Sequence, residues 1–78
     1  MNINDNPETS ASQTARIFSH MVEGKPITAL DALYLYGCFR LSARIKDIEK
    51  EYGVIASRER ILVKNREGKY VYVMRYWI

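Results

Sequence analysis

The hydrophobic periodicity of this chain changes once, at Gly53. Before Gly53, apolar residues recur every three or four positions, as they do on one face of an α-helix. After it, residues from Ile55 to Lys64 and from Tyr70 to Ile78 are rich in β-branched and aromatic types with a period of two, and they flank turn-forming residues at 65–68. The pattern predicts helices followed by one β-hairpin, which is an α+β fold.

The residues from Ile27 to Gly53 predict two helices around a short turn. Thr28 and Asp31 form a capping-box pattern, because the threonine hydroxyl can cap the amide three residues on and the acid lies in the positive first turn. Helix-forming residues follow, and Gly37 can adopt the left-handed conformation that ends a helix. We therefore expect a first helix of about two turns that ends at Tyr36.

The second helix of this pair is amphipathic. Its apolar residues have spacings of four, three and four and precede Gly53: Leu41, Ile45, Ile48 and Tyr52. On a helical wheel, the polar and partly basic remainder comprises Arg40, Ser42, Ala43, Lys46, Asp47 and Lys50. A short helix, a tight turn and a longer helix with a basic outer face are typical of a helix-turn-helix, whose second helix enters the DNA major groove.

The same residues resemble a known family, the short helix-turn-helix proteins common in phages and prophages. The resemblance rests on Ile27-Thr28-Ala29-Leu30, Ala32-Leu33, Tyr36-Gly37-Cys38 and Arg40-Leu41-Ser42-Ala43-Arg44-Ile45. It covers residues 14–55 and implies a winged-helix DNA-binding module. The chain departs from many such proteins in one respect: Tyr36 lies four residues after Ala32, where glycine is usual, and Gly37 comes one residue later. We therefore expect a longer turn.

A further helix is predicted over Ser10 to Val22. Its expected apolar face comprises Ala11, Thr14, Ile17 or Phe18, and Met21. Gly24 and Pro26 would end it. Residues 1–8 are polar and lack periodicity, so we expect a mobile tail there. The predicted architecture is one domain over residues 9–78, a three-helix winged helix-turn-helix with a C-terminal two-stranded β-hairpin wing.

The pairing within the hairpin depends on the loop between its strands. A four-residue loop places Lys64 opposite Lys69, Leu62 opposite Val71, Arg60 opposite Val73 and Arg58 opposite Arg75. A two-residue loop would shift these pairs but would leave each residue on the same face. One face would then close the core with Ile61, Val63, Tyr70, Tyr72, Met74, Tyr76 and Ile78. The other would carry Arg58, Arg60 and Arg75 among Leu62, Val71, Val73 and Trp77. The opposed pair Arg58 and Arg75 would repel unless a phosphate or Glu59 compensates.

The aromatic residues of the chain allow two interpretations. The six tyrosines and Trp77 could form a stacking platform for single-stranded nucleic acid. Their alternation along a strand, and their place on the short helix, instead favour packing in the core. We therefore expect a core role.

Positive charge is concentrated in the C-terminal half. Residues 1–39 carry two Lys or Arg against four Asp or Glu, whereas residues 40–78 carry ten against five, within a net charge of +3. This distribution favours a polyanionic partner, although small basic proteins without one are common.

Other functional classes find little support in the sequence. The single His20 and single Cys38 do not make a metal site or a disulfide, and there is no glycine-rich phosphate loop. We expect no cofactor, no enzymatic activity, and a buried apolar role for Cys38. No apolar run is long enough to span a membrane and residues 1–6 lack a signal-peptide pattern, so we expect a bacterial cytoplasm and no membrane partner.

The predicted DNA contacts fall into two groups. Base contacts are expected from Arg40, Ser42, Ala43, Lys46 and Lys50, because guanidinium and ammonium groups match guanine acceptors and alanine permits close approach. Backbone contacts are expected from Lys25, Thr28, Arg58, Arg60, Lys64, Arg66 and Lys69. The alternative is a solvated charged surface, and Asp47 counts against groove contact because phosphate repels a carboxylate. Arg44 is expected to be structural, with its stem on the core and Asp31 or Asp47 as partner.

These features predict sequence-preferring binding of double-stranded DNA by a small phage or prophage regulator, or by an excisionase-like architectural factor, as a monomer or weak homodimer. The alternative is a winged-helix-derived protein-binding module, such as a phage inhibitor of a host protein. Asp47, Glu49 and Glu51 on the second helix support that alternative, and the basic C-terminal half opposes it. The fold alone does not decide between the two.

Overall fold

The computed structural model describes residues 10–78, and the predicted mobile tail at residues 1–8 lies outside the described residues. The elements, in order, are α1 (Ser10–Val22), β1 (Ile27–Thr28), α2 (Ala29–Tyr36), α3 (Leu41–Tyr52), β2 (Ser57–Lys64) and β3 (Tyr70–Trp77). The three predicted helices and the predicted hairpin are confirmed. The short strand β1 is not predicted by the sequence pattern; it pairs with β3 and makes a three-stranded antiparallel sheet in the order β1-β3-β2.

The ends of the helices follow the local signals in the sequence. At the start of α2, the Asp31 amide donates to Thr28 Oγ1 (3.2 Å) and the Thr28 amide donates to Asp31 Oδ2 (3.0 Å), so the predicted capping box is present. Gly37 ends α2 with a φ of 64°. Gly53 ends α3 with a φ of 66°, in the left-handed region that glycine adopts at least cost.

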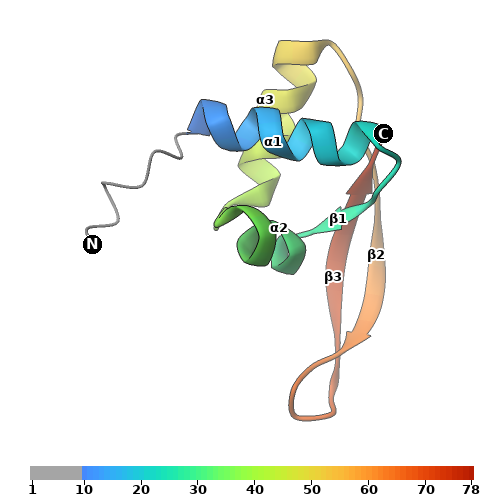
Figure 1. The fold of residues 1–78 in the computed structure, drawn as a ribbon. Helices are drawn as coiled ribbons and strands as arrows, with labels where there is room; N and C mark the ends of the chain where they lie inside the picture. Colours follow the sequence, from blue (N-terminus) through green and yellow to red (C-terminus); the bar gives the residue numbers. More distant parts are fainter. Residues whose placement is uncertain (1–9) are drawn as a thin grey trace, which may run out of the picture.

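The core lies where the three helices meet the base of the hairpin. In Figure 1, α1 crosses α3, α2 lies beside them, and the hairpin extends well beyond all three helices. The buried apolar residues come from every element or its flanking turn: Ile17, Met21, Ile27, Ala32, Cys38, Leu41, Ile45, Ile48, Ala56 and Tyr76. Burial of Cys38 and of the predicted stripe residues Leu41, Ile45 and Ile48 is confirmed.

The register of the hairpin differs by one residue from the predicted one. The four predicted pairs are wrong: Lys64 lies opposite Tyr70, Leu62 opposite Tyr72, Arg60 opposite Met74 and Arg58 opposite Tyr76. The reason is a loop of odd length. The Asn65 amide donates to the Lys69 carbonyl (2.7 Å), which leaves three residues in the loop, and Gly68 takes a φ of 83°. A three-residue loop with a left-handed glycine at its last position is a common hairpin connection.

The shift by one residue regroups the side chains on the two faces of the hairpin. One face, here called the valine face, carries Ser57, Glu59, Ile61, Val63, Val71, Val73, Arg75 and Trp77. The other, here called the tyrosine face, carries Arg58, Arg60, Leu62, Lys64, Tyr70, Tyr72, Met74 and Tyr76. The predicted opposition of Arg58 and Arg75 is therefore wrong, and Arg75 instead forms an ion pair with Glu59 across the strands.

Much of the hairpin that was predicted to close the core is exposed. Tyr76 is buried, but Tyr70 is 63% exposed and Tyr72 is 65% exposed. The cause is the length of the hairpin, because only its base is covered by helices (Figure 1). The core role predicted for the tyrosines therefore holds for Tyr76 and is wrong for Tyr70, for Tyr72 and for Tyr34 on α2, which is 86% exposed.

Substitution of Ile45 by alanine tests the packing of α3. Ile45 is fully buried, so the substitution removes core contacts and should cost about 2 to 5 kcal/mol in the free energy of unfolding. For a domain of this size the melting temperature should fall by about 10 °C or more, as measured by circular dichroism. Ile55→Ala is the matched control, because Ile55 is 87% exposed and should shift the unfolding free energy by no more than about 0.5 kcal/mol. Equal effects would contradict the orientation of α3.

Candidate nucleic-acid interface

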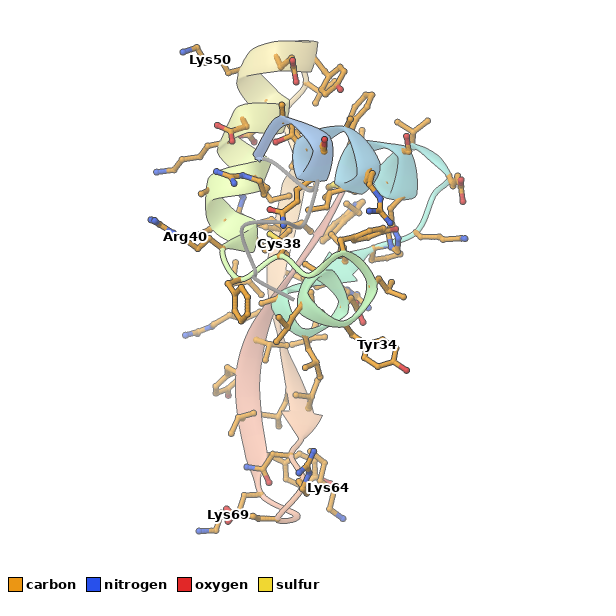
Figure 2. The ribbon with its side chains drawn as sticks, turned by 60° about the vertical axis from the view of Figure 1, so that its left-hand side comes forward. Tyr34, Cys38, Arg40, Lys50, Lys64 and Lys69 are labelled. Atoms are coloured by element: carbon orange, nitrogen blue, oxygen red, sulfur yellow. The ribbon has the colours of Figure 1, made fainter. Side chains whose placement is uncertain are left out.

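The predicted base-contact residues lie along the solvent-facing surface of α3. Because its apolar stripe faces the core, α3 exposes Arg40, Ser42, Lys46 and Lys50, with Ala43 half-buried among them. Figure 2 shows Arg40 and Lys50 projecting from the two ends of α3 toward the same side of the molecule. With a rise of 1.5 Å per residue, this surface is about 15 Å long. The structure therefore brings these five residues onto one helix surface.

Two of the three acidic residues of α3 are engaged by groups of the protein itself. Asp47 Oδ2 lies 3.0 Å from Nε of Arg44, whose side chain is 17% exposed, so the predicted structural pairing of Arg44 with Asp47 is confirmed. Glu49 Oε2 accepts from the Ala56 amide (2.9 Å) and from Arg58 Nη2 (2.9 Å). Pairing reduces the negative field that these carboxylates contribute to the outer surface of α3.

A second basic cluster lies at the tip of the hairpin. Lys64, Arg66 and Lys69 are all exposed there. In Figure 2, Lys64 and Lys69 lie at the far end of the hairpin, well away from Arg40 and Lys50. The structure therefore brings the three tip residues together, but at a distance from the basic surface of α3.

The other predicted backbone contacts have partners within the protein. Arg58 pairs with Glu49, and its guanidinium lies 5.3 Å from the ring centroid of Tyr76. The Arg60 guanidinium lies 4.9 Å from the ring centroid of Tyr72. Arg58 therefore joins the hairpin to α3, and both arginines stabilise the tyrosine face.

Lys25 and Thr28 lie on neither basic cluster. Lys25 Nζ is 3.0 Å from Glu23 Oε1, in a pair that is more than half exposed at both side chains. Thr28 caps α2 together with Asp31, whose carboxylate already occupies the positive first turn of the helix. A phosphate at this helix start would meet that carboxylate.

A groove between α2 and the hairpin is a further surface, which the sequence pattern did not predict. Its volume is about 600 Å³. Apolar residues form most of its lining: Ala29, Leu30, Leu33, Cys38, Phe39, Val63, Val71 and Val73. Lys64, Asn65 and Arg66 complete it at the hairpin tip. The composition of α2 could have indicated this groove, because the helix has eight residues and is rich in leucine and tyrosine. Only Ala32 of these eight residues is buried.

Comparison with known protein families decides the class of the protein. Residues 12–77, which include α2, its turn, α3 and the hairpin, match the family described as winged helix-turn-helix domain. The chain belongs to this family. A winged helix-turn-helix domain is typically a DNA-binding module, with its second helix in the major groove. Comparisons with curated proteins and with solved structures gave no match.

In this winged helix-turn-helix domain, α2 and α3 form the helix-turn-helix and the β2–β3 hairpin is the wing. The predicted family and fold are confirmed. The phage or prophage origin stays a prediction.

Membrane-spanning helices and clusters of metal ligands are absent from the described part of the winged helix-turn-helix domain. Across residues 10–78 no helix is long and apolar enough to cross a membrane, and no three His, Cys, Asp or Glu side chains gather as metal ligands would. His20 is used structurally, since Nδ1 lies 2.7 Å from the Tyr36 hydroxyl and Nε2 lies 3.2 Å from the Pro26 carbonyl oxygen. The contact with Tyr36 ties the end of α1 to α2, and the contact with Pro26 ties it to the segment before β1.

Removal of the Glu49 carboxylate tests how α3 is attached to the wing. In Glu49→Ala the amide of Ala56, a residue only 3% exposed, loses its acceptor, so the free energy of unfolding should fall by about 1 to 3 kcal/mol. Glu51→Ala removes the same charge from an exposed position of α3 and should cost no more than about 0.5 kcal/mol in urea unfolding. If both variants unfold at the same urea concentration, the Glu49 contacts do not stabilise the domain.

Proposed function

We propose that this protein binds double-stranded DNA with sequence preference, as a small regulator or an excisionase-like architectural factor. The observation that carries the proposal is the outer surface of α3. It exposes Arg40, Lys46 and Lys50, while Asp47 and Glu49 are engaged by arginines of the protein itself.

In the proposed complex, α3 enters the major groove. Arg40, Lys46 and Lys50 would donate to guanine N7 and O6, and Ser42 would form a further hydrogen bond to a base. Ala43, near the middle of the same surface, would allow close approach or touch a thymine methyl group. Sequence preference would therefore depend on α3.

The wing would contribute to the affinity for DNA. Lys64, Arg66 and Lys69 at its tip are exposed and would contact phosphates, which adds affinity without sequence information. Among the other predicted backbone contacts, Arg58 and Lys25 would first have to leave Glu49 and Glu23. A phosphate would likewise compete with Tyr72 for Arg60 and with Asp31 for Thr28. We therefore assign the backbone contacts primarily to the tip.

Two sets of substitutions separate base contacts from backbone contacts. Lys46→Ala should weaken binding to a preferred duplex by about 1 to 3 kcal/mol and weaken binding to random duplex much less. The triple replacement of Lys64, Arg66 and Lys69 by alanine should weaken both duplexes alike. It should also lower the magnitude of the slope of log affinity against log salt by roughly one unit for each phosphate that the wing no longer binds. Mobility-shift titrations at several salt concentrations measure both effects.

Lys25→Ala is the charge-matched control for Lys46→Ala, because its ammonium pairs with Glu23 away from both basic clusters. It should change affinity for either duplex by less than the α3 variant does. Absence of salt-dependent binding by the unmodified protein to any duplex would contradict the proposed function.

Protein binding is the second candidate function, and the α2–wing groove is the observation that favours it. Leu30 is 72% exposed and Phe39 is 79% exposed at its edge. Contiguous exposed apolar patches often mark protein contacts. We take a second copy of this chain as the partner, because two associated copies would match two half-sites on DNA.

Sedimentation velocity over a wide range of protein concentration tests this second candidate. Weak reversible association is expected for the unmodified chain, and Leu30→Ser should reduce it because the groove then offers less apolar area for burial. Tyr34→Ser is the control, since Tyr34 is 86% exposed on α2 but does not line the groove. A monomer at every concentration would contradict self-association through the groove.

A further inference from the structure

Two aromatic rings on the tyrosine face of the wing, those of Tyr70 and Tyr72, do not pack in the core. Tyr70 is 63% exposed and Tyr72 is 65% exposed, and neither packs against the core cluster. The two residues are separated by one position in β3, so they point to the same face with backbones about 7 Å apart. The wing thus presents two neighbouring rings to solvent.

Each exposed ring has a cation as its neighbour on β2. Lys64 lies opposite Tyr70, and the Arg60 guanidinium lies 4.9 Å from the ring centroid of Tyr72. The tyrosine face carries no acidic residue, because the one acid of the two strands, Glu59, points to the valine face and pairs with Arg75. The face is therefore both aromatic and positively charged.

This combination fits single-stranded DNA better than a duplex. Surfaces that bind single strands pair aromatic rings, on which bases stack, with cations that follow the phosphates. Arginine guanidinium planes also stack on bases, so Arg60 over Tyr72 adds to such a surface. Bases in a duplex stack on one another and leave no free ring face for the tyrosines.

We propose that the tyrosine face of the wing binds unpaired nucleotides of single-stranded DNA. Together with α3 it would hold a junction between duplex and single strand. The duplex half of this junction rests on the proposed function, but the single-strand site does not. The rings of Tyr70 and Tyr72 and the guanidinium of Arg60 would stack on bases, while Lys64 would contact phosphates.

Fluorescence anisotropy with three kinds of labelled DNA tests the proposal. The probes are an oligothymidylate of about 12 nucleotides, a length within the range that single-strand sites cover, a blunt duplex, and the same duplex with a thymidylate extension on its 3′ or its 5′ end. The unmodified protein should bind the oligothymidylate, and should bind one of the extended duplexes more tightly than the blunt one. Tyr72→Leu should weaken the single-strand affinity by about 5- to 150-fold, whereas Tyr72→Phe, which keeps the ring, should retain it.

Controls separate stacking from folding and from duplex binding. Tyr72→Leu loses the ring contact with Arg60 and should melt at a lower temperature than Tyr72→Phe. Circular dichroism at the binding temperature should show that both variants are folded while their single-strand affinities differ. Tyr34→Ala removes a tyrosine that is 86% exposed on α2 and should leave the single-strand affinity unchanged. Figure 2 shows Tyr34 pointing away from the wing.

The outcomes distinguish this proposal from the proposed function. Tyrosine-dependent binding of oligothymidylate without any duplex binding would support the stacking site and contradict the proposed function. No oligothymidylate binding, or equal affinity of Tyr72→Leu and Tyr72→Phe for it, would overturn the stacking site while duplex binding stands. If Tyr72→Leu weakened binding to the blunt duplex as much as binding to oligothymidylate, the stacking site would also be overturned, because the rings would then contact duplex.

Discussion

Burial of the apolar stripe of α3 is the constraint on which the rest of this structure depends. Ile45 and Ile48 are fully buried, so α3 cannot turn about its axis without exposing them. The rings of Phe18 and Tyr52 stack with their centroids 3.8 Å apart and hold the end of α3 against α1. Because this rotation is fixed, the opposite side of α3 must face solvent. The basic surface proposed to bind DNA is therefore a consequence of core packing.

Ion pairs then determine the charge that this surface presents. Of the acids on α3, Asp47 pairs with Arg44 and Glu49 pairs with Arg58. Glu49 also accepts from the backbone where the chain leaves α3 for β2, so it positions the wing as well as neutralising the helix. In the sequence, Asp47, Glu49 and Glu51 support a protein-binding role of α3. Two of these three, Asp47 and Glu49, form ion pairs within the domain.

The wing is a projecting hairpin held mainly by its own contacts beyond its base. An isolated two-stranded hairpin is marginal in water, so cross-strand contacts matter here. The Glu59–Arg75 pair, the Arg60–Tyr72 contact and the Asn65–Lys69 loop supply them at successive positions along the wing. Since no helix covers the outer part, its two faces are free to differ in chemistry. The valine face lines the groove under α2, and the tyrosine face is cationic and aromatic.

Local chemistry made most of the fold predictable from sequence. Capping by Thr28 and Asp31 and the stops at Gly37 and Gly53 act within a few residues, so the helix limits and the exposed residues of α3 could be predicted. The strand β1 could not, because two residues carry no periodicity and become a strand only by pairing with β3. The exposure of Leu30 and its neighbours likewise depends on which elements cover α2.

The division between sequence and structure is clearest in the wing. By itself the sequence determined the helices, the change to strands after Gly53 and the basic character of the C-terminal half. Residues 65–68 are compatible with more than one loop length, and the pairing was decided by the three-residue loop and by the burial of Tyr76 beside Ile27. Side chains alternate with a period of two, so a shift of one residue in one strand moves its whole set to the other face. For that reason only the tertiary structure placed Arg60 and Lys64 on the same face as Tyr70 and Tyr72.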